Sequence, residues 1–129
     1  MGAILVNLQP RDPPVGVIAL VGEHDAASSP RLANELALLL DEGIAIVVDL
    51  RETTFVDSQT LSTLLAARHD AEEAALGFVL VLPESDAGQV HRLLDLTGLE
   101  ATFGSRSTVE AAVDAARAGE SGAGRVGTR

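Results

Sequence analysis

The sequence predicts an α/β domain with a mixed, mostly parallel sheet of four to five strands and about four helices. One observation is a series of short apolar runs rich in β-branched residues, which is typical of strands buried on both faces. Another is leucine, valine and alanine at helical spacing between those runs. Because strands that alternate with helices form right-handed βαβ units, we expect most of the sheet to be parallel.

The expected strands are apolar runs that end at a glycine, a proline or a polar turn. The first two lie close enough in the sequence to pair antiparallel. In chain order the expected strands are Ile4–Leu8, Val15–Val21, Ile44–Val48, Phe78–Leu82 and a short last strand at Ala101–Phe103.

The expected helices begin at residues that favour helix N-termini and end at glycine. In chain order the predicted starts are Ser29 before Pro30, Asp57 or Ser58, Ser85 or Asp86, and the capping-box pattern Ser107-Thr108-Val109-Glu110. The predicted stops of the first three helices are Gly43, Gly77 (after a last turn near Leu76) and Gly98.

A length of 129 residues fits one domain with its own hydrophobic core. We expect residues 1–118 to form that domain. Residues 119–129, GESGAGRVGTR, are rich in glycine and have almost nothing to bury, so we expect a disordered tail there.

The charge balance excludes several classes of partner. All nine basic residues are arginine, against 19 acidic residues, so the net charge is −10. Nucleic acid and anionic membranes both attract basic surfaces, and no basic stripe is visible. No cysteine is present, and no apolar stretch approaches the 18 residues of a membrane span. We therefore expect a cytoplasmic protein without disulfides, nucleic acid or membrane contact.

No set of residues with recognisable catalytic chemistry stands out. His24, His69 and His91 are scattered and lack metal-ligand spacing. Ser58 lacks a G-x-S-x-G elbow, and no nucleotide-binding glycine motif occurs. A phospho-accepting receiver domain would need a lysine, which this chain lacks. We expect no catalytic residue, cofactor or metal.

The segment from Ile44 to Ala67 combines a buried strand, a polar turn and the start of a helix. Asp57 and Ser58 lie where the extended chain gives way to the leucine pattern of Leu61 and Leu64. One interpretation is that either residue only caps the helix. The other is that Ser58 is phosphorylated, which would place new negative charge at a helix start that tolerates an anion.

Several motifs in order along the chain resemble the STAS domain of bacterial anti-sigma factor antagonists. The resemblance covers roughly residues 4–117. Its motifs are Val47-Val48-Asp49-Leu50, Phe55-Val56-Asp57-Ser58, Gly22-Glu23-x-Asp25, Pro30-x-Leu32 and Thr97-Gly98-Leu99.

The resemblance implies a protein-binding module without enzymatic activity. In that family the serine at the position of Ser58 is phosphorylated by an anti-sigma factor that is an ATP-dependent serine kinase, and phosphorylation breaks the complex. Asp57 would flank or orient the serine, and Asp25 would lie near it. The implied partner-binding residues are Asp25, Asp57, Ser58, Gln59 and Thr60.

Two positions depart from the family pattern. Gln59-Thr60 stands where the family has Ser or Thr followed by Gly, and we expect Thr60 to add bulk on the surface that a partner approaches. His24 stands where leucine is common, and we expect it to bond to Asp25 or to lie in solvent. Rival hydroxyl groups in the same segment are Thr54, Thr60 and Ser62.

These departures keep two other functions open. The chain could be a non-phosphorylated STAS scaffold subunit of a signalling or lipid-transport assembly. It could instead be an enzyme or a small-ligand binder that uses the loop ends near Asp25 and Asp57.

Overall fold

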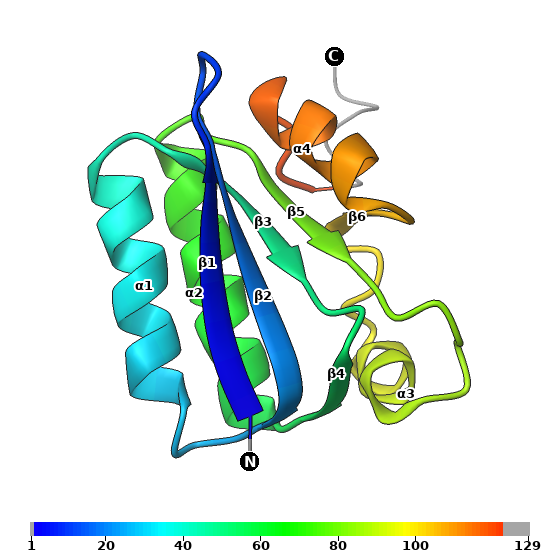
Figure 1. The fold of residues 1–129 in the computed structure, drawn as a ribbon. Helices are drawn as coiled ribbons and strands as arrows, with labels where there is room; N and C mark the ends of the chain where they lie inside the picture. The colour runs from blue at the N-terminus through cyan, green and yellow to red at the C-terminus, as the bar shows by residue number, and fades with distance from the viewer. Residues whose placement is uncertain (1, 123–129) are drawn as a thin grey trace.

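A computed structural model describes residues 2–122 and confirms the expected α/β class. Figure 1 shows the sheet with helices against both of its faces. In chain order the elements are β1 (Gly2–Gln9), β2 (Val15–His24), α1 (Ser29–Asp41), β3 (Ala45–Asp49), β4 (Thr53–Val56), α2 (Ser58–Glu73), β5 (Phe78–Val81), α3 (Gln89–Thr97), β6 (Gly104–Arg106) and α4 (Val109–Arg117).

The strand order is β1-β2-β3-β5-β6. Only β1 pairs antiparallel in the described sheet, and the other pairings are parallel, as expected for βαβ units. The short strand β4 is an addition to the prediction, and it pairs in parallel with the last residues of β2. This pairing places β4, and the start of α2 that follows it, beside the carboxyl end of β2.

The central strands β3 and β5 are buried along their whole length, which explains why β5 is entirely apolar and β3 is apolar up to its last residue, Asp49. Their side chains alternate between two hydrophobic clusters. Ile46 and Val48 join the cluster of α1 and α2, whereas Val47 joins the cluster of α4. Helices α1 and α2 thus cover one face of the sheet and α4 the other, with α3 beside β4 (Figure 1).

The described helices begin near the predicted residues but at different caps. The N-cap of α1 is Ser28, one residue before the prediction, and its side chain makes no capping bond. The N-cap of α3 is Gly88, because Ser85 instead accepts a hydrogen bond from the Ala87 amide within a turn. In α4, Thr108 accepts from the Ala111 amide, so the cap lies one residue beyond Ser107.

Of the three helix ends that were predicted at a glycine, two follow the glycine rule and one does not. Gly43 and Gly98 adopt the left-handed conformation just past α1 and α3. Helix α2 ends earlier than predicted, at Glu73, and the left-handed residue behind it is Ala75 with φ of 59°. Leu76 lies beyond the end of the helix but still packs against the core, which explains why the apolar pattern of the sequence extends past Glu73.

The last strand lies later than the predicted Ala101–Phe103. The amides of Thr102 and Phe103 both donate to the Leu99 carbonyl, which makes this segment a turn. Phe103 is buried in that turn, with its ring centroid 6.3 Å from that of Phe78. Packing of the aromatic ring, and not strand pairing, explains the apolar character of this segment.

The first four residues of the predicted tail are attached to the domain. The Phe78 amide donates to the Glu120 carbonyl at 2.8 Å, Ser121 is buried, and Arg106 forms an ion pair with Glu120. The folded domain therefore extends past residue 118, at least to Gly122. The remainder of that prediction, residues 123–129, lies outside the described residues.

Candidate functional site

The pairing of β2 with β4 brings two of the predicted site segments together. His24 is in register with Val56, and the Asp57 amide donates to the His24 carbonyl at 3.2 Å. The loop that carries Asp25 therefore lies directly beside the start of α2. Sequence separation of about 30 residues hides this proximity, which depends on the unpredicted strand β4.

Asp57 is the residue that caps α2. Its backbone is extended, with φ of −101° and ψ of 179°, and its Oδ1 accepts from the Thr60 amide at 2.9 Å. This is the usual geometry of an N-cap aspartate, which satisfies one of the free amides of the first turn. Of the two residues left open by the sequence, Asp57 caps the helix and Ser58 does not.

Ser58 is the first residue of α2 and is exposed. Its hydroxyl group makes no hydrogen bond to any described residue. The amides of a helix's first turn and its dipole favour negative charge at this position. The local structure thus leaves Ser58 Oγ accessible and able to carry an anionic group without disturbing the cap.

Thr60 points into the protein, which corrects the expectation that it adds bulk to the surface. Its side chain is fully buried, and its Oγ1 lies 3.1 Å from the His24 carbonyl and 3.0 Å from Asp57 Oδ1. Thr60 therefore ties the cap to the end of β2. It cannot itself contact a partner, so its place in the predicted partner-binding set is indirect.

His24 is also buried, contrary to both alternatives considered for it. Its Nε2 donates to the Val21 carbonyl at 3.1 Å, because a carbonyl oxygen only accepts, and Nδ1 lies 3.1 Å from Ser28 Oγ. The ring therefore holds the end of β2 against the start of α1. The Asp25 side chain is exposed and accepts from the Ala27 amide at 3.0 Å, within its own loop.

Gln59 and Phe55 extend the exposed surface around Ser58. Phe55 on β4 is 39% exposed, whereas the other two phenylalanines of the chain are buried. Gln59 is exposed at one end of a mainly apolar groove of about 400 Å³ between α1 and α2. Other residues that line this groove include Ala33, Ala37, Ser62 and Ala66.

Gln89 supports the site and was missed from the sequence. Its side-chain Oε1 accepts from the Val56 amide at 2.9 Å, and its Nε2 donates to the Val56 carbonyl at 2.8 Å. The carboxamide thus bonds to β4 as a neighbouring strand would. Nothing in the local sequence marks Gln89, because its partner lies 33 residues away.

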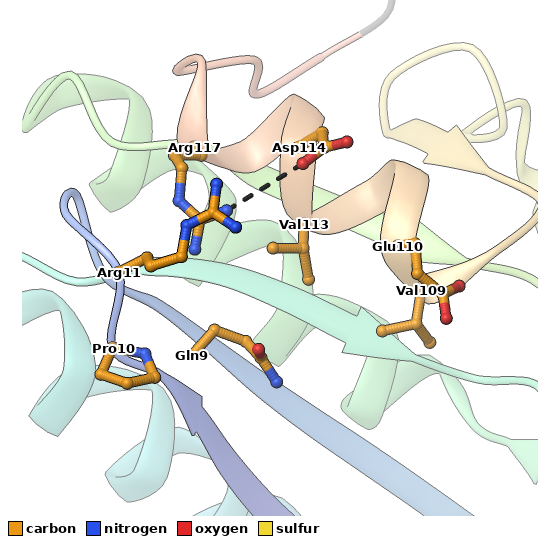
Figure 2. A pocket seen from close by; sticks show the side chains of 8 residues that line it. All are labelled: Gln9, Pro10, Arg11, Val109, Glu110, Val113, Asp114 and Arg117. Carbon is orange, nitrogen blue, oxygen red and sulfur yellow. Dashed lines mark ion pairs between the residues drawn. The ribbon is translucent and has the colours of Figure 1, made fainter.

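Another hollow lies at the opposite end of β2 from Asp25. Figure 2 shows its lining residues, which come from the end of β1, the β1–β2 turn and α4 and surround an open volume of about 300 Å³. Arg117 closes one side, because its Nε donates to the Pro13 carbonyl at 3.0 Å and its Nη1 lies 4.0 Å from Asp114. This hollow is remote from Ser58 and does not contribute to the candidate site.

Asp49, the last residue of β3, forms an ion pair with Arg51 at the carboxyl end of the sheet. Arg51 Nε and Nη2 each donate to Asp49 at 2.9 Å, in a bidentate arrangement. The hydrogen bond and the charge of Asp49 raise the pKa of Arg51 above its ordinary value. Arg51 therefore stays cationic, and the pair closes the end of β3.

Within residues 2–122, no helix combines the length and apolarity that crossing a bilayer requires. The same part of the chain holds no group of three or more histidine, aspartate or glutamate side chains placed to bind a metal ion.

Comparison with known proteins places this architecture in a family. Residues 8–110 match the family described as "Mlab, STAS domain". This match spans well over half of the chain, so the protein belongs to the STAS domain family. No curated protein sequence matches it significantly.

Solved structures with the same fold include anti-sigma factor antagonists. One from Mycobacterium paratuberculosis is 29% identical, with a TM-score of 0.71 over 89% of this chain and 95% of that one. Unphosphorylated SpoIIAA is 19% identical, with a TM-score of 0.69 over 89% and 98% of the two chains. Phosphorylated SpoIIAA from Bacillus is 21% identical, with a TM-score of 0.66 over 87% and 97%.

Proposed function

We propose that this STAS domain is an anti-sigma factor antagonist whose binding to an anti-sigma factor kinase is switched by phosphorylation of Ser58. The observation that carries the proposal is the exposed, unbonded Ser58 hydroxyl beside a helix cap that Asp57 already satisfies. Its fold, shared with the antagonist from Mycobacterium paratuberculosis, supports the same assignment.

In this mechanism the kinase transfers the γ-phosphoryl group of ATP to Ser58 Oγ, with release of ADP and the hydroxyl proton. The product gains roughly −1.5 to −2 charges at neutral pH. The domain retains its fold, because the phosphate lies in solvent at a helix N-terminus. The partner surface becomes strongly anionic next to Asp57 and the Asp25 loop, and like charges across an interface can cost several kcal/mol.

The proposed contact surface comprises Asp25, Asp57, Ser58 and Gln59. Buried Thr60 contributes indirectly, because it holds Asp57 in place. Phe55 adds an exposed aromatic side chain at its margin, and aromatic residues are enriched at protein interfaces. The protein would act in the cytoplasm, without a cofactor, and would not bind nucleic acid itself.

The test combines phosphorylation and binding. The protein is incubated with its cognate anti-sigma factor kinase and ATP, and the phosphate is located by mass spectrometry. Calorimetry then compares kinase binding of Ser58→Ala and Ser58→Glu with that of the parent. We expect phosphate on Ser58, near-parental affinity for Ser58→Ala, and affinity lowered at least about tenfold (1.4 kcal/mol) for Ser58→Glu.

Ser107→Glu is the matched control. Ser107 is also an exposed serine beside a helix start, but it precedes α4 after the edge strand β6. The Ser107→Glu variant should bind the kinase with the affinity of the parent protein. Equal affinities for Ser58→Ala and Ser58→Glu, or phosphate found on Thr54 or Ser62 instead, would contradict the switch at Ser58.

A second candidate is a non-phosphorylated STAS scaffold subunit of a signalling or lipid-transport assembly. The observation that favours it is the description of the matching family, "Mlab, STAS domain", which does not mention sigma factors. Affinity purification from the native cell distinguishes the two. A transporter ATPase recovered equally well with the parent and with Ser58→Glu would support the scaffold and exclude the switch.

A further inference from the structure

Strand β1 is an edge of the sheet that residues 2–122 form. It stands at the end of the strand order, and all eight of its residues pair with β2, from Gly2 opposite Gly22 to Gln9 opposite Val15. In an antiparallel strand the backbone amides and carbonyls point alternately to the two sides. Half of those in β1 therefore face away from β2, where they can pair with another strand.

This edge lacks the features by which proteins usually prevent strand addition. Its sequence, GAILVNLQ, contains no charged residue and no proline, and its register with β2 is regular. Charged side chains, proline, bulges and very short edge strands are the common protective devices. The opposite edge differs, because β6 has only three residues and ends in Arg106.

Exposed apolar side chains lie on both faces of β1. Leu5, Val6 and Leu8 are 57%, 45% and 49% exposed. Val6 and Leu8 lie on the same face as buried Ile4, toward α1 and α2, and Leu5 lies on the other face. A strand added beside β1 would cover side chains on both faces and satisfy the free backbone groups together.

We propose that β1 is a homodimer interface, in which the β1 strands of two copies pair antiparallel about a twofold axis and join their sheets. A second copy fits because it offers a strand of the same length, also without charge. With a net charge of −10, most other contacts between copies would bring acidic residues together. The proposal does not depend on the antagonist assignment.

The geometry also limits the strength of this dimer and the registers open to it. Eight extended residues span about 27 Å, so the paired edge is at the small end of specific interfaces, and the dimer should depend on concentration. A twofold axis perpendicular to the sheet keeps each side chain on its own face. One residue of β1 therefore lies opposite its own copy, with the two Cα atoms roughly 4.5–5.5 Å apart.

Sedimentation measures the association directly. We expect the mass to rise from 13.3 kDa toward twice that value as the concentration increases from about 1 μM to about 1 mM. Val6→Lys should keep the protein monomeric over this range, because a lysine on an edge strand opposes the addition of another strand. Leu38→Lys is the matched control: Leu38 is 59% exposed on α1, and this variant should dimerise like the parent.

Single cysteines test the register, since the chain has no cysteine of its own. Leu5→Cys, Val6→Cys, Asn7→Cys and Leu8→Cys are oxidised separately, with Leu38→Cys as the control. A disulfide needs Cα atoms about 4.4–6.8 Å apart, so one β1 position should cross-link far faster than its neighbours and the control. The proposal is overturned by a monomer throughout, by dimers that survive Val6→Lys, or by cross-linking equally fast at all positions.

Discussion

At the scale of single residues, Thr60 shows how a small buried side chain fixes the site. Its hydroxyl oxygen lies within hydrogen-bond distance of two acceptors, the His24 carbonyl and Asp57 Oδ1, while its amide donates to the same Asp57 oxygen. A glycine here would leave the His24 carbonyl with only the Asp57 amide. Compared with glycine, Thr60 therefore adds a side-chain hydrogen bond and makes the backbone at this position less flexible.

We predict that Thr60→Val lowers the free energy of unfolding by about 1–2 kcal/mol, because it removes the buried hydroxyl while keeping the shape. Urea denaturation measures the loss. Thr63→Val is the control, since its hydroxyl bonds only to the Gln59 carbonyl of the same helix and it lies nearer the surface. Its effect should stay within about 0.5 kcal/mol, and equal losses would contradict the role assigned to Thr60.

At the scale of elements, β4 has a strand on one side only, and a side chain takes the place of a second neighbouring strand. It has only four residues, pairs with β2 on one side, and bonds to the Gln89 carboxamide through both backbone groups of Val56. Ser58 follows two residues later. Loss of the Gln89 hydrogen bonds should therefore also make the backbone at the start of α2 more mobile.

We predict that Gln89→Glu releases β4. The carboxylate still accepts from the Val56 amide, but it faces the Val56 carbonyl without a proton to donate. Hydrogen exchange of the Val56 and Asp57 amides should accelerate at least about tenfold relative to the parent, with helix content unchanged. Gln89→Ala, which removes both bonds without adding charge, should give a smaller acceleration. Unchanged exchange in both variants would show that β2 alone holds β4.

Element types were predictable from the sequence, but several boundaries and contacts were not. The apolar sequence runs of β3 and β5 predict buried strands, because both faces of these strands are covered. In contrast, caps at Gly88 and Thr108 lie within one to three residues of equally suitable side chains, so local chemistry does not choose between them.

The candidate site divides in the same way. The exposed Ser58 and the capping pair at the start of α2 follow from local sequence, because a cap and its helix are neighbours in the chain. The buried positions of His24 and Thr60 and the Gln89 contact depend on residues brought together by the parallel pairing of β2 and β4. Contacts of this kind between distant parts of the chain cannot be predicted from a local sequence pattern.

At the scale of the whole molecule, the net charge of −10 acts on both folding and association. Nine arginines cannot pair with 19 acidic residues, and the described ion pairs are mostly at the surface, where each contributes little. Repulsion among the remaining carboxylates opposes the compact state and also opposes contact between two copies. Salt should therefore stabilise this protein, in contrast to one held together by surface ion pairs.

We predict that raising NaCl from about 10 mM to about 300 mM at pH 7 raises the Tm by a few degrees, because the screening length falls from roughly the width of the domain to less than about 8 Å. Scanning calorimetry at low protein concentration keeps dimerisation out of the measurement. The control repeats the scans near the pI of about 4.5, where the net charge is close to zero and the effect should largely vanish. A Tm that falls with salt at pH 7 would mean that ion-pair attraction outweighs the repulsion. The same screening should tighten the β1 dimer, whose strands carry no charge but whose copies repel each other as a whole.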